Sequence, residues 1–150
     1  FNFDDYPTTH EKVKELKPWF ETQWNWGKQF LDYTGRNKSV HTYERFRIEV
    51  ERFILWSALV KLKPIDDLRK SDILEFADFC WQPPVNWIGV SNQDRFRLEN
   101  SFFVTNEEWR PFKIQAPKSQ KNIILDRKKY RPSQQTLTSV FTAIIVFYNY

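Results

Sequence analysis

The chain has 150 residues, of which 41% are hydrophobic and 18% aromatic, with one cysteine, no methionine and three glycines. A chain of this length can bury one hydrophobic core, and its composition excludes both a disordered segment and an internal disulfide framework. Because no apolar run approaches the roughly 20 residues that cross a bilayer, and because one thiol fits a reducing compartment, we expect a cytoplasmic protein with no membrane partner.

The formal net charge of +4 is distributed unevenly along the chain. Residues 1–109 carry 15 basic and 18 acidic side chains, whereas residues 110–150 carry 8 basic and 1 acidic. All eight of these basic residues lie between Arg110 and Arg131. A basic segment of this kind is typical of a protein that binds nucleic acid or another anionic surface, although a solvated basic loop explains the same run.

The first third of the chain predicts a lead-in followed by a helix. Residues 1–18 form the lead-in, within which His10–Leu16 make a short helical turn. Pro18 suits the first turn of a helix expected over 19–33. Gly35 follows that helix at a position typical of a helix C-cap.

A second helix is expected over residues 40–61, before Pro64, which cannot continue it. Its core stripe recurs at helical spacing and consists of Tyr43, Phe46, Val50, Phe53, Ile54 and Ala58. A second apolar side is formed by Ile48, Leu55, Leu59 and Leu62. Two apolar sides predict a central helix.

Two further helices complete the predicted set. Ser71 is the expected N-cap of a short helix over 72–79, with acidic residues in its first turn. The last helix is expected over 133–150, directly after Pro132, and it has a broad apolar face.

Residues 81–131 predict an irregular, aromatic-rich insertion punctuated by Pro, Gly and Asn. Within it, 100–104 reads as a short strand or 95–104 as a helix, and the pattern leaves both open. The sequence as a whole therefore predicts one mostly α-helical domain of four or five helices over residues 1–150. The absence of a starting methionine and the apolar C-terminal end indicate a piece of a longer protein.

Two of the predicted helix starts combine a Ser/Thr cap with basic side chains. The unpaired N–H groups and positive dipole end of a helix N-terminus favour phosphate, and nearby cations strengthen the attraction. The candidate DNA-binding residues are Arg36, Lys38, Ser39, His41, Thr42 and Arg45 at the first start, and Lys128, Lys129, Arg131, Ser133, Gln134 and Thr136 at the second.

Each residue type in these groups suits a particular DNA contact. Arg and Lys bind phosphate or read guanine, and Gln134 or Gln135 is suited to reading adenine. Ser39 and Ser133 can cap a helix and also donate to phosphate. An exposed cap residue explains His41 equally well.

Four short blocks occur in a fixed order along the chain. They are Ser39, Thr42 and Tyr43 with the run Arg52–Trp56; then Pro64, Asp67, Leu68, Asp72, Ile73 and Phe76; then the WRPF block Trp109–Phe112; and last Tyr130–Ser133, which opens an apolar helix. In order and spacing, over roughly residues 19–150, they resemble the N-terminal core-binding (SAM-like) domain of tyrosine-type site-specific recombinases, the phage integrase family.

This resemblance implies a domain that grips duplex DNA at a recombination site. In that family two helices of the domain lie across the major groove, and here they correspond to the N-terminal parts of the helices over 40–61 and 133–150. A separate C-terminal domain cleaves and rejoins the strands. The implied partners are duplex DNA, this chain's own catalytic domain and other recombinase protomers.

The chain itself lacks the chemistry of that catalytic domain. The family's His-x-x-Arg motif is missing, because Val13 follows His10 and Glu44 follows His41 at the third position. Two histidines and one cysteine do not form a standard metal site, and neither glycine-rich phosphate loop is present, so we expect no metal and no cofactor. We therefore assign no catalytic residue and expect no enzymatic activity from this fragment, with Tyr148 and Tyr150 as helix residues.

Two other functions remain open on the sequence alone. One is a helical protein-interaction domain with a basic docking loop, and the other is an RNA-binding module. The seven tryptophans favour core positions over base stacking, since only Trp109-Arg110 and Lys129–Arg131 interleave aromatic and basic residues. A DNA-binding domain needs both basic groups on one face, whereas an interaction domain needs an exposed apolar groove.

Overall fold

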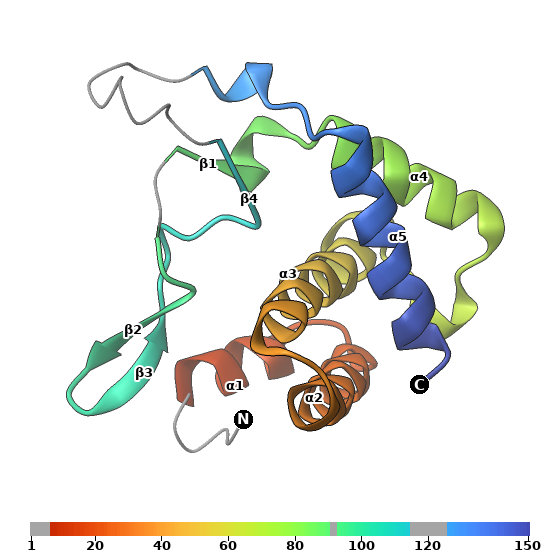
Figure 1. Cartoon of the computed structure of the whole chain (residues 1–150). Helices are drawn as coiled ribbons and strands as arrows, with labels where there is room; N and C mark the ends of the chain where they lie inside the picture. The colour runs from red at the N-terminus through yellow and green to blue at the C-terminus, as the bar shows by residue number, and fades with distance from the viewer. Residues whose placement is uncertain (1–6, 91–92, 115–125) are drawn as a thin grey trace.

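The computed structural model describes residues 7–90, 93–114 and 126–150. Five α-helices make up most of this part: α1 (Pro7–Glu15), α2 (Phe20–Asn37), α3 (Val40–Trp56), α4 (Lys70–Trp81) and α5 (Gln134–Tyr148). The protein is therefore mostly helical, as predicted, and the expected lead-in contains a helix (Figure 1). None of the described helices is long and apolar enough to span a membrane.

Helices α2, α3 and α5 meet in an aromatic core. The Phe30 ring of α2 lies 5.8 Å from Phe46 of α3 and 5.3 Å from Phe147 of α5. Phe53 of α3 lies 5.1 Å from Phe76 of α4. These rings belong to one hydrophobic cluster to which all five helices contribute, and burial of this apolar surface is the main force that holds the helices together.

The ends of α2 and α3 differ from the predicted ends. Helix α2 continues through Gly35 to Asn37, so the predicted C-cap is wrong. No glycine among the described residues has a positive φ, and Gly35 has an ordinary helical place beside the Tyr43 ring. Helix α3 passes into a π-helix, Ser57–Lys61, which ends at Leu62 with φ 56°.

The second apolar side is largely exposed, although α3 packs against α2 and α5 as expected of a central helix. Ile48, Leu59 and Leu62 are exposed by 39%, 49% and 58%. The π-turn adds one residue to the helical repeat and shifts the direction of the side chains after Trp56. The predicted stripe through Phe46 and Phe53 faces the core, together with Trp56, and Leu55 of the second side is partly buried against it.

Helix α4 is capped differently from the prediction. It begins two residues before 72, after an N-cap at Arg69, and Ser71 is exposed in its first turn. The Asp72 carboxylate accepts from the Arg69 backbone N–H at 2.8 Å and pairs with Lys61 and Lys63, each at 2.9 Å. Asp72, rather than Ser71, therefore caps the N-terminus of this helix, because its ionised carboxylate is a strong acceptor and has two cationic partners.

The predicted insertion contains short regular elements. Two 3₁₀ turns lie in it, at Val85–Trp87 and Arg127–Lys129 (η5), and a third, Ile65–Asp67, lies outside it before α4. Strand β1 (Ile88–Gly89) pairs in parallel with β4 (Phe112–Lys113), and β2 (Phe96–Glu99) pairs antiparallel with β3 (Phe102–Thr105). The helix alternative over 95–104 is therefore wrong, and the strand alternative holds for residues 102–104.

The β2–β3 hairpin projects from the helical body beside α1 (Figure 1). Its two turn residues, Asn100 and Ser101, have φ values of 50° and 67°. Positive φ at both central residues is the pattern of a type I′ turn, whose twist matches that of the flanking strands. Glu99 and Phe102 are therefore paired directly across the turn.

Arg52 of α3 fixes the irregular segment to the helical body. Its Nε donates to the carbonyl of Pro111 at 2.7 Å, and its guanidinium lies 4.3 Å from the centre of the Phe112 ring. It also pairs with the buried Glu49 at 3.2 Å. Burial raises the pKa of Glu49 although the Arg52 charge opposes this shift, so the arginine compensates a carboxylate that would otherwise lack a partner.

We expect Asp72→Asn to lower stability at neutral pH and to remove part of its acid dependence. The Arg69 N–H and the two lysines lower the pKa of Asp72 from 3.8, so its contribution is complete above that value and is lost as the pH falls below it. Melting temperatures of wild type and variant should therefore converge between about pH 4 and 2. The matched control is Asp78→Asn, at an exposed position of the same helix. A constant wild-type to variant difference down to pH 2 would contradict this assignment.

Candidate nucleic-acid interface

The first group of candidate residues surrounds the short connection between α2 and α3. Ser39 is the N-cap of α3, and its Oγ accepts from the Thr42 N–H at 3.2 Å and lies 3.0 Å from the Thr42 hydroxyl. Arg36 lies in the last turn of α2 and Lys38 is its C-cap. His41 and Arg45 follow in the first two turns of α3, and both are exposed.

The second group repeats this arrangement at the start of α5. Ser133 is the N-cap, and its Oγ accepts from the Thr136 N–H at 3.1 Å and lies 2.8 Å from the Thr136 hydroxyl. Lys128 and Lys129 belong to η5, which directly precedes this cap. The Arg131 guanidinium donates to the Tyr130 carbonyl at 2.6 Å. Both serine caps predicted from the sequence are therefore present, and in each the serine accepts from the threonine three residues later.

Most cations of these groups have no acidic partner. Arg36, Lys38, Lys128 and Lys129 are exposed and form no ion pair with another described residue. Cations elsewhere behave differently, since Arg95 binds Glu51 at 2.6 Å. At each cap the first backbone N–H groups of the helix also lie beyond the reach of intrahelical acceptors. Each helix start therefore presents donors and positive charge to an anion.

The two groups of cations lie far apart on the molecule. Tyr150, just after α5, contacts Tyr33 near the end of α2 at 5.3 Å between ring centres. The opposite end of α5, which carries Ser133, lies about 22 Å away along a 15-residue helix. Figure 1 shows the start of α5 beside η5, remote from the connection between α2 and α3. A single phosphate therefore cannot contact both groups.

Sequence reasoning left one cation beside the second group out of the candidate residues. Arg127 is exposed in η5 and adds a cation to Lys128 and Lys129. The run Arg127–Lys129 was a sufficient signal for it. Gln135, already suited to reading adenine, is exposed beside Gln134 in the first turn of α5. Lys118 and Lys121 of the basic segment lie outside the described residues.

The two aromatic–basic pairs do not form open stacking surfaces. Trp109 is half-buried and the guanidinium of Arg95 lies 4.6 Å from its ring centre. Tyr130 is half-buried against Phe112, with the rings 5.7 Å apart and edge to face. Burial also raises the pKa of Tyr130. The geometry therefore gives little support to base stacking of single strands on these two rings.

The Cys80 thiol and the Tyr148 hydroxyl, which could act as nucleophiles, are buried or hydrogen-bonded. Burial raises the pKa of the Cys80 thiol to about 12, which makes this thiol a poor nucleophile. The Tyr148 hydroxyl donates to the Ile65 carbonyl at 2.6 Å, and burial raises its pKa as well. Over residues 7–90, 93–114 and 126–150, no group of three or more His, Cys, Asp or Glu side chains is placed to hold a metal ion.

An open groove lies on another part of the surface. Its apolar lining includes Leu59 and Val60 of the π-helix together with Trp87 and Trp109, and polar side chains such as Arg95 and Asn106 also line it. Its volume is about 510 Å³. Leu59 and Val60 are roughly half exposed.

Comparison with known proteins adds no evidence about this candidate site. Neither the protein-family models, nor the curated proteins, nor the solved structures contain a match to this chain. The interface is therefore defined by its residues: two Ser-capped helix starts, each with exposed cations.

Proposed function

We propose that this protein binds duplex DNA through the starts of α3 and α5. The observation that carries this proposal is the pair of Ser-x-x-Thr caps. Arg36 and Lys38 lie near one cap and Lys128 and Lys129 near the other, all exposed and without an ion pair to another described residue. Helix N-termini and cations bind phosphate, and contacts of this kind supply most of the affinity of proteins for DNA. No acidic residue lies in α5 or at its cap.

In this proposal the two groups contact two backbone segments of one duplex. Helix α5 alone is about 22 Å long, which exceeds the major-groove width of about 12 Å and is less than one helical turn of about 34 Å. The groups then position the protein, and residues between them approach base edges.

The exposed start of α5 has the side chains that suit base reading. Helix α5 carries no charged residue. The hydroxyls of Thr138 and Ser139 donate to the carbonyls of Gln134 and Gln135, at 3.1 and 2.9 Å. The two glutamine amides make no side-chain hydrogen bond to another described residue. A glutamine amide can bond adenine in two places, so Gln134 and Gln135 are the base-reading candidates.

The recombinase resemblance supports a more specific form of this proposal. In that form the chain is the core-binding domain of a site-specific recombinase, and a catalytic domain outside this chain cleaves and rejoins the DNA. The helix caps at Ser39 and Ser133 coincide with the first and last blocks of the resemblance. Its partners are then duplex DNA, that catalytic domain and further protomers.

A protein-interaction domain is the second candidate function. The groove between Leu59, Val60 and the two tryptophans favours it, because exposed apolar surface of this kind marks sites that bind other proteins. The basic segment would then dock an acidic partner. This candidate predicts no preference for duplex DNA.

Binding measured at several salt concentrations tests the proposal. If four to six phosphates are contacted, we expect the logarithm of the association constant to fall against the logarithm of salt with a slope of roughly −4 to −5, because bound cations release counterions. Gel-shift assays with a labelled duplex provide the measurement, and single-stranded DNA and RNA are the competitors. Affinity that is equal at low and high salt would leave the protein-interaction function ahead.

A further inference from the structure

The basic turn η5 (Arg127–Lys129) exposes its cationic side chains, while hydrogen bonds close its backbone at both ends. Before the turn, the Asp126 carboxylate accepts from the Lys128 N–H at 3.0 Å. After it, the Tyr130 N–H donates to the Arg127 carbonyl at 3.2 Å. The turn is therefore locally well defined, and the direction in which it points depends on how it is attached to the rest of the protein.

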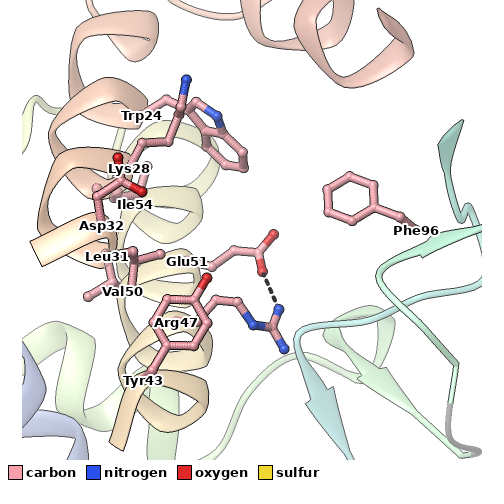
Figure 2. Close-up of a pocket in the computed structure, with 11 residues that line it drawn as sticks. Trp24, Lys28, Leu31, Asp32, Tyr43, Arg47, Val50, Glu51, Ile54 and Phe96 are labelled. Atoms are coloured by element: carbon pink, nitrogen blue, oxygen red, sulfur yellow. Dashed lines mark ion pairs between the residues drawn. The ribbon is translucent and has the colours of Figure 1, made fainter. Parts of the chain in front are cut away.

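The cations of this turn are not oriented by carboxylates. Lys128 and Lys129 form no ion pair with another described residue. Arg47 of α3 shows the contrast, because it pairs with Glu51 at 4.0 Å, the ion pair drawn as a dashed line in Figure 2. The direction of the two lysines is therefore set by the backbone of η5, which needs an anchor of its own.

Tyr130 attaches the turn to the interior of the protein. Its side chain is half-buried, and its ring lies 5.7 Å from the Phe112 ring at an interplanar angle of 68°. An edge-to-face contact of this kind is favourable beyond the area that it buries, and its energy depends on the relative orientation of the rings. Burial raises the pKa of Tyr130 and the charge of Arg52 opposes this shift, which agrees with a ring that points inward.

The Phe112 ring, against which Tyr130 packs, is itself held by two helices. Phe112 is 1% exposed and belongs to β4, which pairs with β1. The Phe79 ring of α4 lies 6.0 Å from it, and the Arg52 guanidinium of α3 lies 4.3 Å from its centre. Arg52 also donates to the carbonyl of the preceding Pro111 at 2.7 Å. Through Phe112, Tyr130 therefore connects η5 to α3 and α4.

We propose that Tyr130 is the positioning residue of the second group of cations. Its ring anchors η5 on Phe112, and this anchor presents Lys128 and Lys129 to an anion in a fixed direction. A segment that is ordered before binding loses less conformational freedom when it binds, so it binds more tightly. The use of the anchor in DNA binding rests on the proposed function, whereas the anchor itself can be measured in the free protein.

Backbone dynamics of the free, ¹⁵N-labelled chain test the anchor without DNA. We expect the heteronuclear nuclear Overhauser effects of the Arg127–Lys129 amides to match those of α5 in the wild type. Tyr130→Ala should lower them, because the turn then moves on the picosecond-to-nanosecond timescale. Tyr130→Phe keeps the ring and should restore them. Low values in the wild type, or unchanged values in Tyr130→Ala, would overturn the proposal.

Gel-shift assays with a labelled duplex test the use of the anchor, at a temperature at which thermal melts show every variant to be folded. We expect Tyr130→Ala to weaken binding by about three- to tenfold, with the salt slope unchanged because both lysines remain. In a chain that already carries Lys128→Ala and Lys129→Ala, Tyr130→Ala should change affinity by less than about twofold, because the ring acts through those lysines. Equal losses in the two backgrounds would overturn the positioning role.

Two further variants keep the test decisive. Phe102→Ala is the matched control, because it removes an exposed ring from β3, in the hairpin that projects from the helical body (Figure 1), and should leave affinity and dynamics of η5 unchanged. Tyr130→Leu replaces Tyr130→Ala if the latter does not fold, and its effects should be smaller but in the same direction. If the wild-type chain binds no duplex, the proposed function fails together with this use of the anchor, and the dynamics alone decide whether Tyr130 holds η5.

Discussion

Replacing Gln23 by leucine is expected to lower the free energy of unfolding by about 2–3 kcal/mol. Gln23 is 1% exposed at the centre of the fold. Its Nε2 donates to the Ser57 hydroxyl at 3.0 Å, and its Oε1 accepts from the Ile65 backbone N–H. Leucine has a similar volume but no acceptor, so the Ile65 N–H would stay buried and unpaired.

The effect has a clear control and a clear measurement. Ser57 still donates to the Ile54 carbonyl in the variant, so the lost stability comes mainly from Ile65. Gln29→Leu changes an exposed glutamine of the same helix and should alter stability by less than about 0.5 kcal/mol. Urea denaturation followed by circular dichroism measures both. A loss below about 1 kcal/mol for Gln23→Leu would show that water or backbone movement satisfies the Ile65 N–H.

The sequence predicts those features of the fold that depend on a few neighbouring residues. The helices over 40–61 and 133–150 follow from apolar spacing, and both serine caps follow from their hydroxyls three residues before a threonine. The boundary errors have local causes too. Gly35 resembles a C-cap but has no need of a positive φ, because Lys38 ends α2 in an extended conformation.

Features that depend on contacts between residues far apart in the sequence could not be predicted from local patterns. Gln23 reads as a surface residue until Ser57 and Ile65 approach it from 34 and 42 positions along the chain. The hairpin turn at Asn100 and Ser101 lacks the glycine that usually identifies a type I′ turn. Arg52 likewise gains its role from Pro111, which is 59 positions away.

The candidate interface shows the same division between local and distant information. The identity of its residues is local, because cations and caps adjoin in sequence at Arg36–Ser39 and at Lys128–Ser133. Their separation depends on how α5 packs against α2 and α3. Sequence patterns therefore identify two candidate helix starts, and the tertiary packing decides where these lie relative to each other.

Replacing Lys128 and Lys129 together by alanine is expected to weaken duplex binding roughly tenfold to hundredfold at low salt. Both lysines are exposed in η5 and have no ion pair with a described residue, so their removal should leave stability nearly unchanged. Loss of two phosphate contacts should also flatten the salt slope by nearly two units. The effect should be the same on every sequence, because phosphate contacts carry no sequence information.

A charge-matched control decides whether the effect is local. Lys17→Ala with Lys70→Ala removes the same charge from exposed positions away from both caps, and we expect less than a threefold change in affinity. Gln134→Ala should instead alter preference among sites while the salt slope stays constant, since an amide reads bases. If the two double variants weaken binding equally, net charge rather than the start of α5 explains the affinity. A specific loss at Lys128 and Lys129 would place the DNA backbone at that cap.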